Sequence, residues 1–320
     1  MITKLDQMFE VLKSRKKKRL VAAYANDEHT ISAVNMAIDL GIIEGTLVGD
    51  ENEIRKVCKA LDIDPSRMTI VHEADEMKAT EKAVELINNG EGNLLMKGLV
   101  STDKYMRAIL NKDKGLMDKG AVLSHVTVME NPFYHKLLTV GDVAILPAPE
   151  LGEKIAITNY LIKTAKALGI EMPKVAIIAA SEQVSPKMPA CVDASIISKM
   201  ADRGQIKGAY VDGPLALDVA IDKESADIKK VGGMVAGDAD CLVFPNIESG
   251  NVFYKTNTKL AGGEQGAVVV GARVPAVLSS RGDSTKTKLY SIALAALTSP
   301  KSHASINKQK KECQLQSADL

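Results

Sequence analysis

The sequence of 320 residues contains no tryptophan, and it has only 4 phenylalanines and 7 tyrosines. Surfaces that bind sugars or unpaired nucleotide bases depend on aromatic side chains, because the rings of the ligand stack on them. A chain this poor in aromatic residues gives no support to a carbohydrate-binding or base-stacking protein. Because 46% of the residues are hydrophobic, the core must consist mainly of aliphatic side chains.

The chain also lacks an excess of charge of either sign, since 41 lysines and arginines against 40 aspartates and glutamates leave a net charge of +1. Proteins that bind nucleic acids or anionic membranes usually carry a strongly basic region. We therefore expect no nucleic-acid partner and no membrane partner. Basic residues do cluster at residues 13–19, where we interpret them as the solvated end of a first helix.

Cysteine and histidine are few and scattered. The four cysteines have no short pair spacing, which excludes a disulfide framework and a zinc ribbon. The five histidines show no ligand spacing, so we expect no metal site. The N-terminus does not have the pattern of a signal peptide, and no apolar run approaches the length of about 18 residues that spans a membrane. These absences predict a reduced, cytoplasmic protein.

The chain does have a regular alternation of short apolar runs and amphipathic segments. The apolar runs predict strands at residues 20–25, 45–50, 68–73, 93–98, 174–181, 208–213, 241–246 and 267–272. Segments with helical periodicity lie between most of these runs. Strands that are buried on both faces and that alternate with helices are typical of a parallel sheet. The predicted fold class is therefore α/β, with mainly parallel sheets.

The alternation breaks at residues 120–146, where the turn-rich segment NPFYH joins two strand-like runs without room for a helix. This pattern predicts an antiparallel excursion or a domain boundary. We predict two α/β domains with a cleft between them. The first consists of residues 1–138 plus 281–320, and the second consists of residues 139–280.

Three loops that follow apolar strands carry the hydroxyl, amide, glycine and basic residues that suit anion binding. In open α/β sheets, ligands bind at the carboxyl ends of the strands, where helix N-termini offer unpaired N–H groups. The candidate residues of the first loop are Lys97, Ser101, Thr102 and Arg107. Those of the second loop are Asn246, Ser249, Gly250 and Asn251, and those of the third are Ser280, Arg281 and Asp283.

Ser101, Ser249 and Ser284 are also good candidates for ordinary helix caps. Spacing alone therefore leaves open whether the loops bind an anion or only begin helices. The loops match neither the P-loop nor the G-x-G-x-x-G dinucleotide motif. The sequence also lacks the G-x-S-x-G motif of many hydrolases.

The segments around these loops resemble those of the phosphate acyltransferases, a family that moves an acyl group between coenzyme A and inorganic phosphate. The resemblance covers residues 10–300 and is carried by KGLVSTDKYMRAIL, YVDGPLALDVAI, CLVFPNIESGNVFYK and SSRGDS. Two other segments, DVAILPAPELGEKIAITNYLIKTAKALG and ASEQVSPKMPA, resemble the phosphate butyryltransferase branch of the family.

The resemblance implies a fold like that of the isocitrate and isopropylmalate dehydrogenases, and a homodimer or higher homo-oligomer built through the second domain. It implies the reversible conversion of butanoyl-CoA and phosphate into butanoyl phosphate and CoA, coupled to an acyl (butyrate) kinase. CoA and phosphate are then substrates, and we expect no cofactor. We also expect direct attack in a ternary complex, because no Cys or Ser–His pair indicates an acyl-enzyme.

By position, Ser280 matches the family serine that hydrogen-bonds the CoA thiol. Arg281 matches the arginine that holds the phosphate and the developing oxyanion, and Arg107 matches a CoA-binding arginine. Acetyltransferases of the family have an aspartate seven residues after the serine, proposed as the base for the thiol, but this chain has Thr287 there. The general base is therefore unassigned, with Asp283 as a weak substitute.

Three other interpretations make different demands. A phosphate acetyltransferase shares the chemistry and differs in the volume of its acyl pocket. A metal- and NAD-dependent dehydrogenase needs clustered aspartates, for which Asp212, Asp218 and Asp222 are only a partial match. A non-catalytic CoA-binding homologue has no need of Ser280 and Arg281, which this chain retains.

Overall fold

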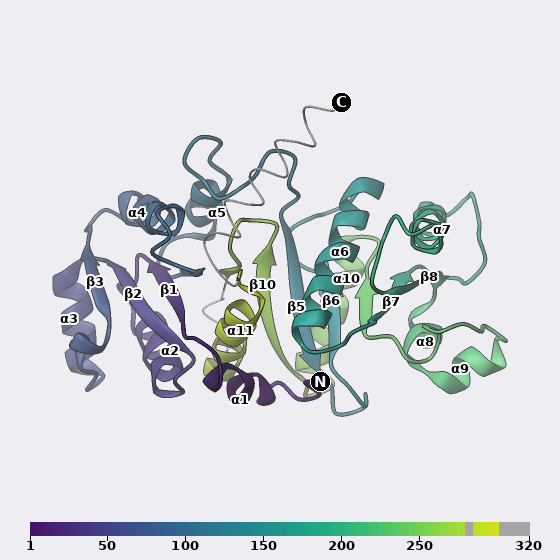
Figure 1. Ribbon diagram of the computed structural model, residues 1–320, viewed down its shortest axis with the longest axis horizontal. Coiled ribbons are helices and arrows are strands. Elements are labelled where there is room, and N and C mark those ends of the chain that lie inside the picture. Colours follow the sequence, from purple (N-terminus) through teal and green to yellow (C-terminus); the bar gives the residue numbers. More distant parts are fainter. Residues whose placement is uncertain (279–283, 301–320) are drawn as a thin grey trace. The chain divides into compact units, whose positions relative to one another are not determined.

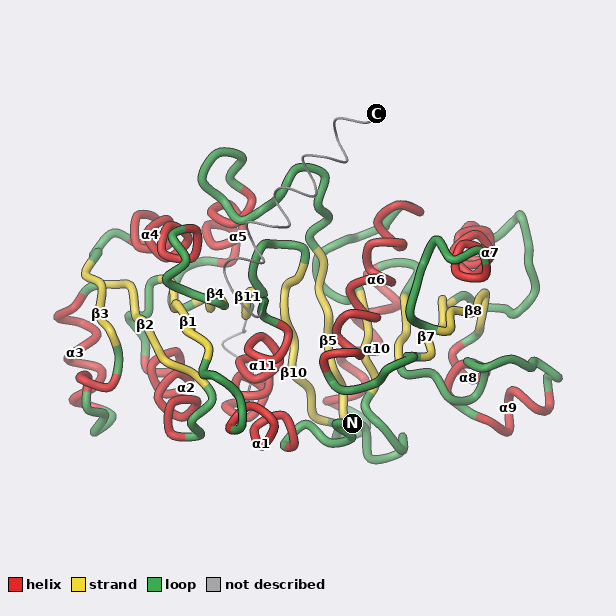
Figure 2. Tube along the Cα trace, viewed as in Figure 1, coloured by secondary structure: helices red, strands yellow, loops and turns green. Residues whose placement is uncertain are grey.

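The structure is a computed structural model that describes residues 1–278 and 284–300. The chain divides into two compact units. The terminal unit comprises residues 9–121 and the described residues from 268 onward, and the central unit comprises residues 1–8 and 122–267. In both units helices and strands follow one another along the chain (Figures 1 and 2). The predicted α/β class is confirmed.

The sheet of the terminal unit has the strand order β3-β2-β1-β4-β11-β10. Its strands are β1 (Lys18–Ala23), β2 (Ile43–Gly49), β3 (Thr69–His72), β4 (Leu94–Lys97), β10 (Glu264–Val270) and β11 (Ala276–Val277). Neighbouring strands from β3 to β11 pair in parallel, whereas β10 and β11 are antiparallel. The boundary between the units falls within β10.

The helices of the terminal unit cover this sheet. They are α2 (Glu28–Asp39), α3 (Glu51–Ala60), α4 (Glu76–Asn88), α5 (Thr102–Leu110) and α11 (Thr285–Thr298), with most of α1 (Gln7–Lys13) and a 3₁₀ turn at Pro65–Arg67. Helix α2 contacts α3 and α11, and α4 contacts α5 (Figure 1). Helix α11 is buried along all of residues 288–297, as its nearly continuous apolar sequence requires.

The central unit has the strand order β5-β6-β9-β7-β8. Its strands are β5 (Ser124–Glu130), β6 (Leu138–Gly141), β7 (Lys174–Ile178), β8 (Tyr210–Leu215) and β9 (Cys241–Val243). Strands β5 and β6 are antiparallel, which confirms the antiparallel pair predicted at residues 120–146. The other neighbours are parallel, so the sheets are mainly parallel, as predicted.

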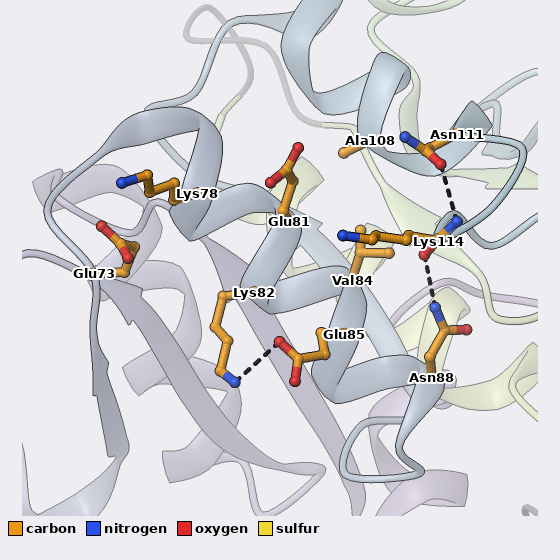
Figure 3. Close-up of a pocket in the computed structure, with 10 residues that line it drawn as sticks. All are labelled: Glu73, Lys78, Glu81, Lys82, Val84, Glu85, Asn88, Ala108, Asn111 and Lys114. Atoms are coloured by element: carbon orange, nitrogen blue, oxygen red, sulfur yellow. Dashed lines mark hydrogen bonds and ion pairs between the residues drawn. The ribbon is translucent and has the colours of Figure 1, made fainter.

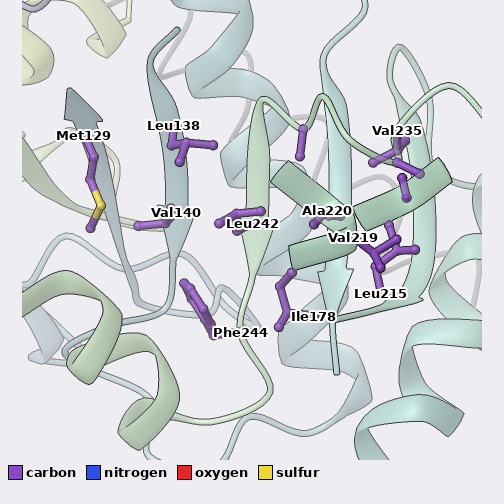
Figure 4. Close-up of a cluster of buried hydrophobic side chains, with 14 of the residues drawn as sticks. Met129, Leu138, Val140, Ile178, Leu215, Val219, Ala220, Val235, Leu242 and Phe244 are labelled. Atoms are coloured by element: carbon purple, nitrogen blue, oxygen red, sulfur yellow. The ribbon is translucent and has the colours of Figure 1, made fainter. Parts of the chain in front are cut away.

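The central unit has an aliphatic core, which confirms that prediction. Its helices are α6 (Leu151–Ala167), α7 (Pro189–Asp202), α8 (Leu217–Ile221), α9 (Lys223–Ile228) and α10 (Ile247–Lys259). A cluster of buried side chains joins β6, β7 and β9 to α8 and α9 (Figure 4). Phe244 is the aromatic residue buried in this cluster, and its ring lies 5.3 Å from that of Phe253 on α10.

The division into units differs from the predicted boundaries. The structure divides the chain after residues 121 and 267, whereas we predicted residues 138 and 280. Strand β5 pairs with β6 and so belongs to the central unit. Strand β11 pairs with β4, which places it in the terminal unit. The first eight residues also join the central unit, where the Ile2 N–H donates to the Leu168 carbonyl at 2.8 Å.

Candidate functional site

The first predicted loop leaves β4 at Lys97 and is pressed against the end of β1. The Gly98 N–H donates to the Ala23 carbonyl at 2.9 Å, and the Leu99 N–H donates to the Tyr24 carbonyl at 2.8 Å. A Cβ on Gly98 would lie 2.4 Å from the Tyr24 carbonyl oxygen, so only glycine fits there. This contact fixes the direction in which the chain approaches α5.

Ser101 is the N-cap of α5, and its hydroxyl accepts a hydrogen bond from the Lys104 N–H at 3.4 Å. The Ser101 N–H itself donates to a carboxylate oxygen of Glu76 on α4 at 3.0 Å. The Lys104 ammonium forms an ion pair with the same carboxylate. Hydrogen bonds from Lys104 and Ser101 lower the pKa of Glu76. Glu76 thus holds the capping turn of α5 in place.

Two basic residues of this loop have different surroundings. The half-buried Lys97 folds its ammonium back on its own loop, where it donates to the Gly98 and Val100 carbonyls at 3.1 and 2.8 Å. The side chain of Arg107 is 69% exposed and pairs with Asp103 one helical turn away at 2.7 Å. Because an exposed ion pair is worth at most about 1 kcal/mol, an anionic ligand can replace Asp103 at little cost.

Strands β11 and β4 are parallel, so their carboxyl ends lie at the same end of the sheet. In their parallel pairing, Ala276 lies opposite Leu95 and Val277 lies opposite Met96. The buried Tyr105 hydroxyl of α5 donates to the Val277 carbonyl at 3.3 Å. The structure therefore places the residues that lead into the third predicted loop beside the first loop.

The three predicted residues of the third loop, Ser280, Arg281 and Asp283, lie outside the described residues. Ser284, which follows them, is the N-cap of α11, and its hydroxyl accepts a hydrogen bond from the Thr287 N–H at 3.1 Å.

The second predicted loop follows β9 in the central unit and begins α10. Asn246 is the N-cap, and its side-chain oxygen accepts from the Ser249 N–H at 3.0 Å and from the Ser249 hydroxyl at 2.8 Å. The prediction that Ser249 caps this helix is therefore wrong, because Asn246 is the cap and Ser249 lies inside the first turn. Ser249 also turns its hydroxyl toward the cap. The Ile247, Ser249 and Gly250 N–H groups already donate to the Pro147 carbonyl, the Asn246 side chain and the Asn246 carbonyl, so a ligand at this turn would meet mainly the positive end of the helix dipole.

Gly250 and Asn251 pack against the loop that follows β6. The Asn251 amide donates to the Val143 carbonyl at 3.0 Å. A Cβ on Gly250 would lie 2.4 Å from the Asp142 carbonyl oxygen, which explains the glycine. In the central unit the described candidates therefore gather at the start of α10. In the terminal unit Ser101 and Thr102 begin α5, whereas Lys97 ends β4 and Arg107 lies in the last turn of α5.

Asp142 was missed by the sequence analysis. It follows β6 directly and is only 1% exposed. Five groups donate to its carboxylate: the Ser124 hydroxyl at 2.9 Å and the N–H groups of His125, Ala144, Ile145 and Leu146 at 3.0, 2.7, 2.9 and 3.4 Å. An acidic residue directly after an apolar strand, in LLTVGD, was the available signal.

A cavity of about 490 Å³ lies beside α4 and α5 (Figure 3). Its lining contains none of the residues predicted from the sequence; it consists of Glu73, Lys78, Glu81, Lys82, Val84, Glu85, Asn88, Ala108, Asn111 and Lys114. Three carboxylates and three ammonium groups balance one another there. This lining does not favour a strongly anionic ligand over a neutral one.

Residues 1–278 and 284–300 contain no group of three or more His, Cys, Asp or Glu residues arranged to hold a metal ion. Within those same residues, every helix is too short or too polar to cross a membrane.

Capped helix N-termini follow the carboxyl ends of mainly parallel strands, which is the arrangement found in the class of α/β proteins that bind anionic ligands at these ends. The family described as "Phosphate acetyl/butaryl transferase" matches residues 4–85 and 73–296. The chain belongs to this family of acyltransferases, as the sequence resemblance indicated.

Two curated relatives match nearly the whole chain. A phosphate butyryltransferase from Clostridium acetobutylicum is 47% identical over 297 residues, which cover 93% of this chain and 98% of the relative. A phosphate acetyltransferase from Thermotoga maritima is 40% identical over 293 residues, which cover 92% of this chain and 99% of the relative. Both branches considered from the sequence are therefore represented among its relatives.

Solved structures agree with the fold. A branched-chain phosphotransacylase from Enterococcus faecalis V583 superimposes with a TM-score of 0.77 at 31% identity, covering 88% of this chain and 98% of that one. A 4-hydroxythreonine-4-phosphate dehydrogenase from Klebsiella pneumoniae superimposes with a TM-score of 0.56 at 11% identity, covering 88% and 99%. The second likeness concerns the fold alone, and it agrees with the dehydrogenase-like fold expected from the resemblance.

Proposed function

We propose that this protein catalyses the reversible transfer of a butanoyl group between CoA and inorganic phosphate. The observation that carries the proposal is the 47% identity, over 93% of the chain, to a protein named phosphate butyryltransferase. The physiological role would be in short-chain fatty acid metabolism, where an acyl kinase consumes the acyl phosphate.

The proposed reaction is a single acyl transfer in a ternary complex. A phosphate oxygen attacks the thioester carbonyl carbon, and a tetrahedral oxyanion forms. The C–S bond then breaks, and the CoA thiolate leaves and takes up a proton. A thiol with a pKa of about 8.5 is a good leaving group that needs little assistance. Most of the acceleration then comes from positioning the two substrates, which contributes about 7–11 kcal/mol.

In this proposal the third loop carries the catalytic residues. Arg281 forms bidentate, charge-assisted hydrogen bonds with the phosphate and the oxyanion. Ser280 hydrogen-bonds the sulfur of CoA. Asp283 remains a weak candidate for the base, because Thr287 stands where acetyltransferases of the family have an aspartate. These roles rest on the resemblance of SSRGDS to the family segment.

The two described loops then bind the anionic parts of the substrates. Lys97, Ser101, Thr102 and Arg107 supply a capped helix start and an exposed guanidinium for CoA. The second loop supplies the first turn of α10, with Asn246, Ser249, Gly250 and Asn251. Helix N-termini bind anions through their N–H groups and dipoles, so a nearly neutral chain can recognise highly charged substrates locally.

A second candidate function is phosphate acetyltransferase activity, which the 40% identical relative from Thermotoga maritima favours. Each CH₂ group buried in an acyl pocket contributes only about 0.8 kcal/mol. We therefore expect this protein to accept several short acyl chains, with a preference for butanoyl. Competition between acetyl-CoA, propanoyl-CoA and butanoyl-CoA measures that preference.

The proposal includes an assembly and a compartment. We expect a homodimer or higher homo-oligomer in the cytoplasm, with no metal or redox cofactor. Sedimentation equilibrium tests the oligomer. Activity that survives EDTA treatment and dialysis supports the absence of a metal requirement.

The decisive test measures thiol release from butanoyl-CoA with and without phosphate. We expect release only with phosphate, together with stoichiometric butanoyl phosphate. A non-catalytic CoA-binding homologue would bind butanoyl-CoA and release no thiol. Mass spectrometry of the protein incubated with butanoyl-CoA alone tests the direct attack, since an acyl-enzyme adduct contradicts it.

A further inference from the structure

The Asp142 carboxylate is buried, and the donors around it among the described residues are all neutral groups. Its five hydrogen bonds come from four backbone N–H groups and the Ser124 hydroxyl. In the part of the chain that the structure describes, it forms no ion pair with a lysine, arginine or histidine. Burial of a carboxylate is costly unless hydrogen bonds replace those it made with water. Loss of any of the five donors would therefore destabilise the folded protein.

The donors belong to two segments that the carboxylate ties together. Ala144, Ile145 and Leu146 follow Asp142 in the same loop, so the loop curls around its own first side chain. Ser124 and the His125 N–H lie at the start of β5. The carboxylate therefore fixes the shape of the loop and anchors it to the neighbouring strand.

The first turn of α10 rests on this same loop. The Asn251 amide donates to the Val143 carbonyl, and the Ile247 N–H donates to the Pro147 carbonyl at 2.9 Å. Gly250 approaches the Asp142 carbonyl so closely that no larger residue fits. The position of the α10 turn is therefore set by the backbone that the Asp142 side chain shapes.

We propose that Asp142 is a positioning residue for acyl transfer, because it fixes the loop that places the substrate-binding turn of α10. This inference rests on the proposed function, which assigns that turn to the anionic substrates. Asp142 does not serve as the missing general base, since its side chain is 1% exposed and its oxygens already accept five hydrogen bonds.

The first test is the variant Asp142→Asn. An amide has one oxygen, so in either orientation its NH₂ group faces N–H donors and the loop must rearrange. Misplacement of a binding group by about 1 Å can cost roughly 10²-fold in rate. We expect kcat/KM for butanoyl-CoA and phosphate to fall by roughly that factor, with higher KM values for both substrates.

The second test reaches the same contact from α10, in case Asp142→Asn does not fold. In Gly250→Ala, the new methyl group meets the Asp142 carbonyl and displaces the α10 turn. We expect the same rise in both KM values. Gly152→Ala is the matched control, because a Cβ at this helical glycine meets no atom within 4 Å, and it should keep the wild-type KM values.

A double-mutant cycle separates positioning from mere stability. If Asp142 acts through the loop, Asn251→Ala should lower kcat/KM less in the Asp142→Asn background than in the wild type. If both Asp142→Asn and Gly250→Ala lower the Tm but leave kcat/KM unchanged, the positioning role of Asp142 is wrong, whereas the proposed function still stands. A wild-type protein that releases no thiol from butanoyl-CoA in the presence of phosphate overturns the proposed function and, with it, this inference.

Discussion

The hydroxyl oxygens of Ser284 and Thr287 lie 3.0 Å apart in the first turn of α11. Ser284 also accepts the Thr287 N–H, so Thr287 takes part in the cap that begins the helix. Thr287 stands where acetyltransferases of the family have an aspartate. Its hydroxyl is therefore better explained as a member of the cap than as a proton acceptor.

The variant Thr287→Val tests this explanation. Valine keeps the shape of threonine and the backbone N–H that Ser284 accepts, and it removes only the hydroxyl. A neutral hydrogen bond contributes about 1 kcal/mol, so we expect kcat to change by less than roughly tenfold. Steady-state kinetics in both directions measure it. A loss of a hundredfold or more at an unchanged Tm would place this hydroxyl among the reacting groups.

Arg281 should be the residue on which turnover depends most. Loss of one transition-state donor costs roughly 10²-fold or more in kcat, and we expect Arg281→Ala to lose at least that much. Arg281→Lys should recover little, because lysine does not form the bidentate pair. Arg203→Ala, at an exposed arginine that ends α7, is the control. Wild-type kinetics of a folded Arg281→Ala variant contradict the proposed site.

Asp238 should make the protein sensitive to acid. Burial raises its pKa, but hydrogen bonds from Lys174, Lys136 and His135 outweigh this effect and lower the pKa from 3.8 to about 2. Because the pKa is lower in the folded protein, the stabilisation is present above about pH 4 and is lost as the pH falls toward 2. In Asp238→Asn, unfolding by urea should show a stability about 1 kcal/mol lower at pH 7, after allowance for solvent screening.

The same variant should have a smaller loss of stability between pH 4 and pH 2 than the wild type, because the titrating group is gone. If the free energy of unfolding falls equally in the two proteins between pH 4 and pH 2, Asp238 does not cause the acid sensitivity. Asp202→Asn is a matched control, since Asp202 forms an exposed pair with Lys199 on α7.

Lys154 of α6 and Asp193 of α7 form an ion pair at 2.6 Å, with side chains that are 7% and 22% exposed. Removal of one partner leaves a buried charge uncompensated. Asp193→Ala should therefore lower the free energy of unfolding by about 3 kcal/mol. The double variant Lys154→Met with Asp193→Leu should recover most of this loss. An Asp193→Ala variant as stable as the wild type would mean that water or a rotated side chain compensates Lys154.

Local sequence patterns predicted much of the fold, because strands and helix caps depend mainly on residues that are close in the sequence. Buried strands need continuous apolar runs, and the predicted caps Ser101 and Ser284 do begin helices. The third predicted cap, Ser249, lies three residues after the true cap Asn246. The antiparallel pair followed from a turn-rich segment that is too short for a helix. The predicted unit boundaries differ from the structure because strand partners decide them, and the pairing of β11 with β4 leaves no mark in either strand's own sequence.

The candidate site was predicted in part. Hydroxyl and amide residues after strands indicated which loops to consider, and resemblance to a family supplied the ligands. The inward fold of Lys97 and the network around Asp142 depend on backbone groups that tertiary structure brings together. Beyond the acidic residue after the strand in LLTVGD, the sequence offers no local signal for these contacts, because every residue carries such backbone groups.

The order of the units along the chain affects how the protein is synthesised. Helix α11 contacts α2, β4 and β11, yet the whole segment 122–267 of the central unit is made between β4 and β11. During synthesis, β1 to β4 and α2 are therefore present before α11, and the apolar surface of α2 and β4 that α11 later covers is still exposed. Exposed apolar surface of this kind is prone to aggregation. The terminal unit, although its residues 9–121 are made before residues 122–267 of the central unit, is the last to complete its core.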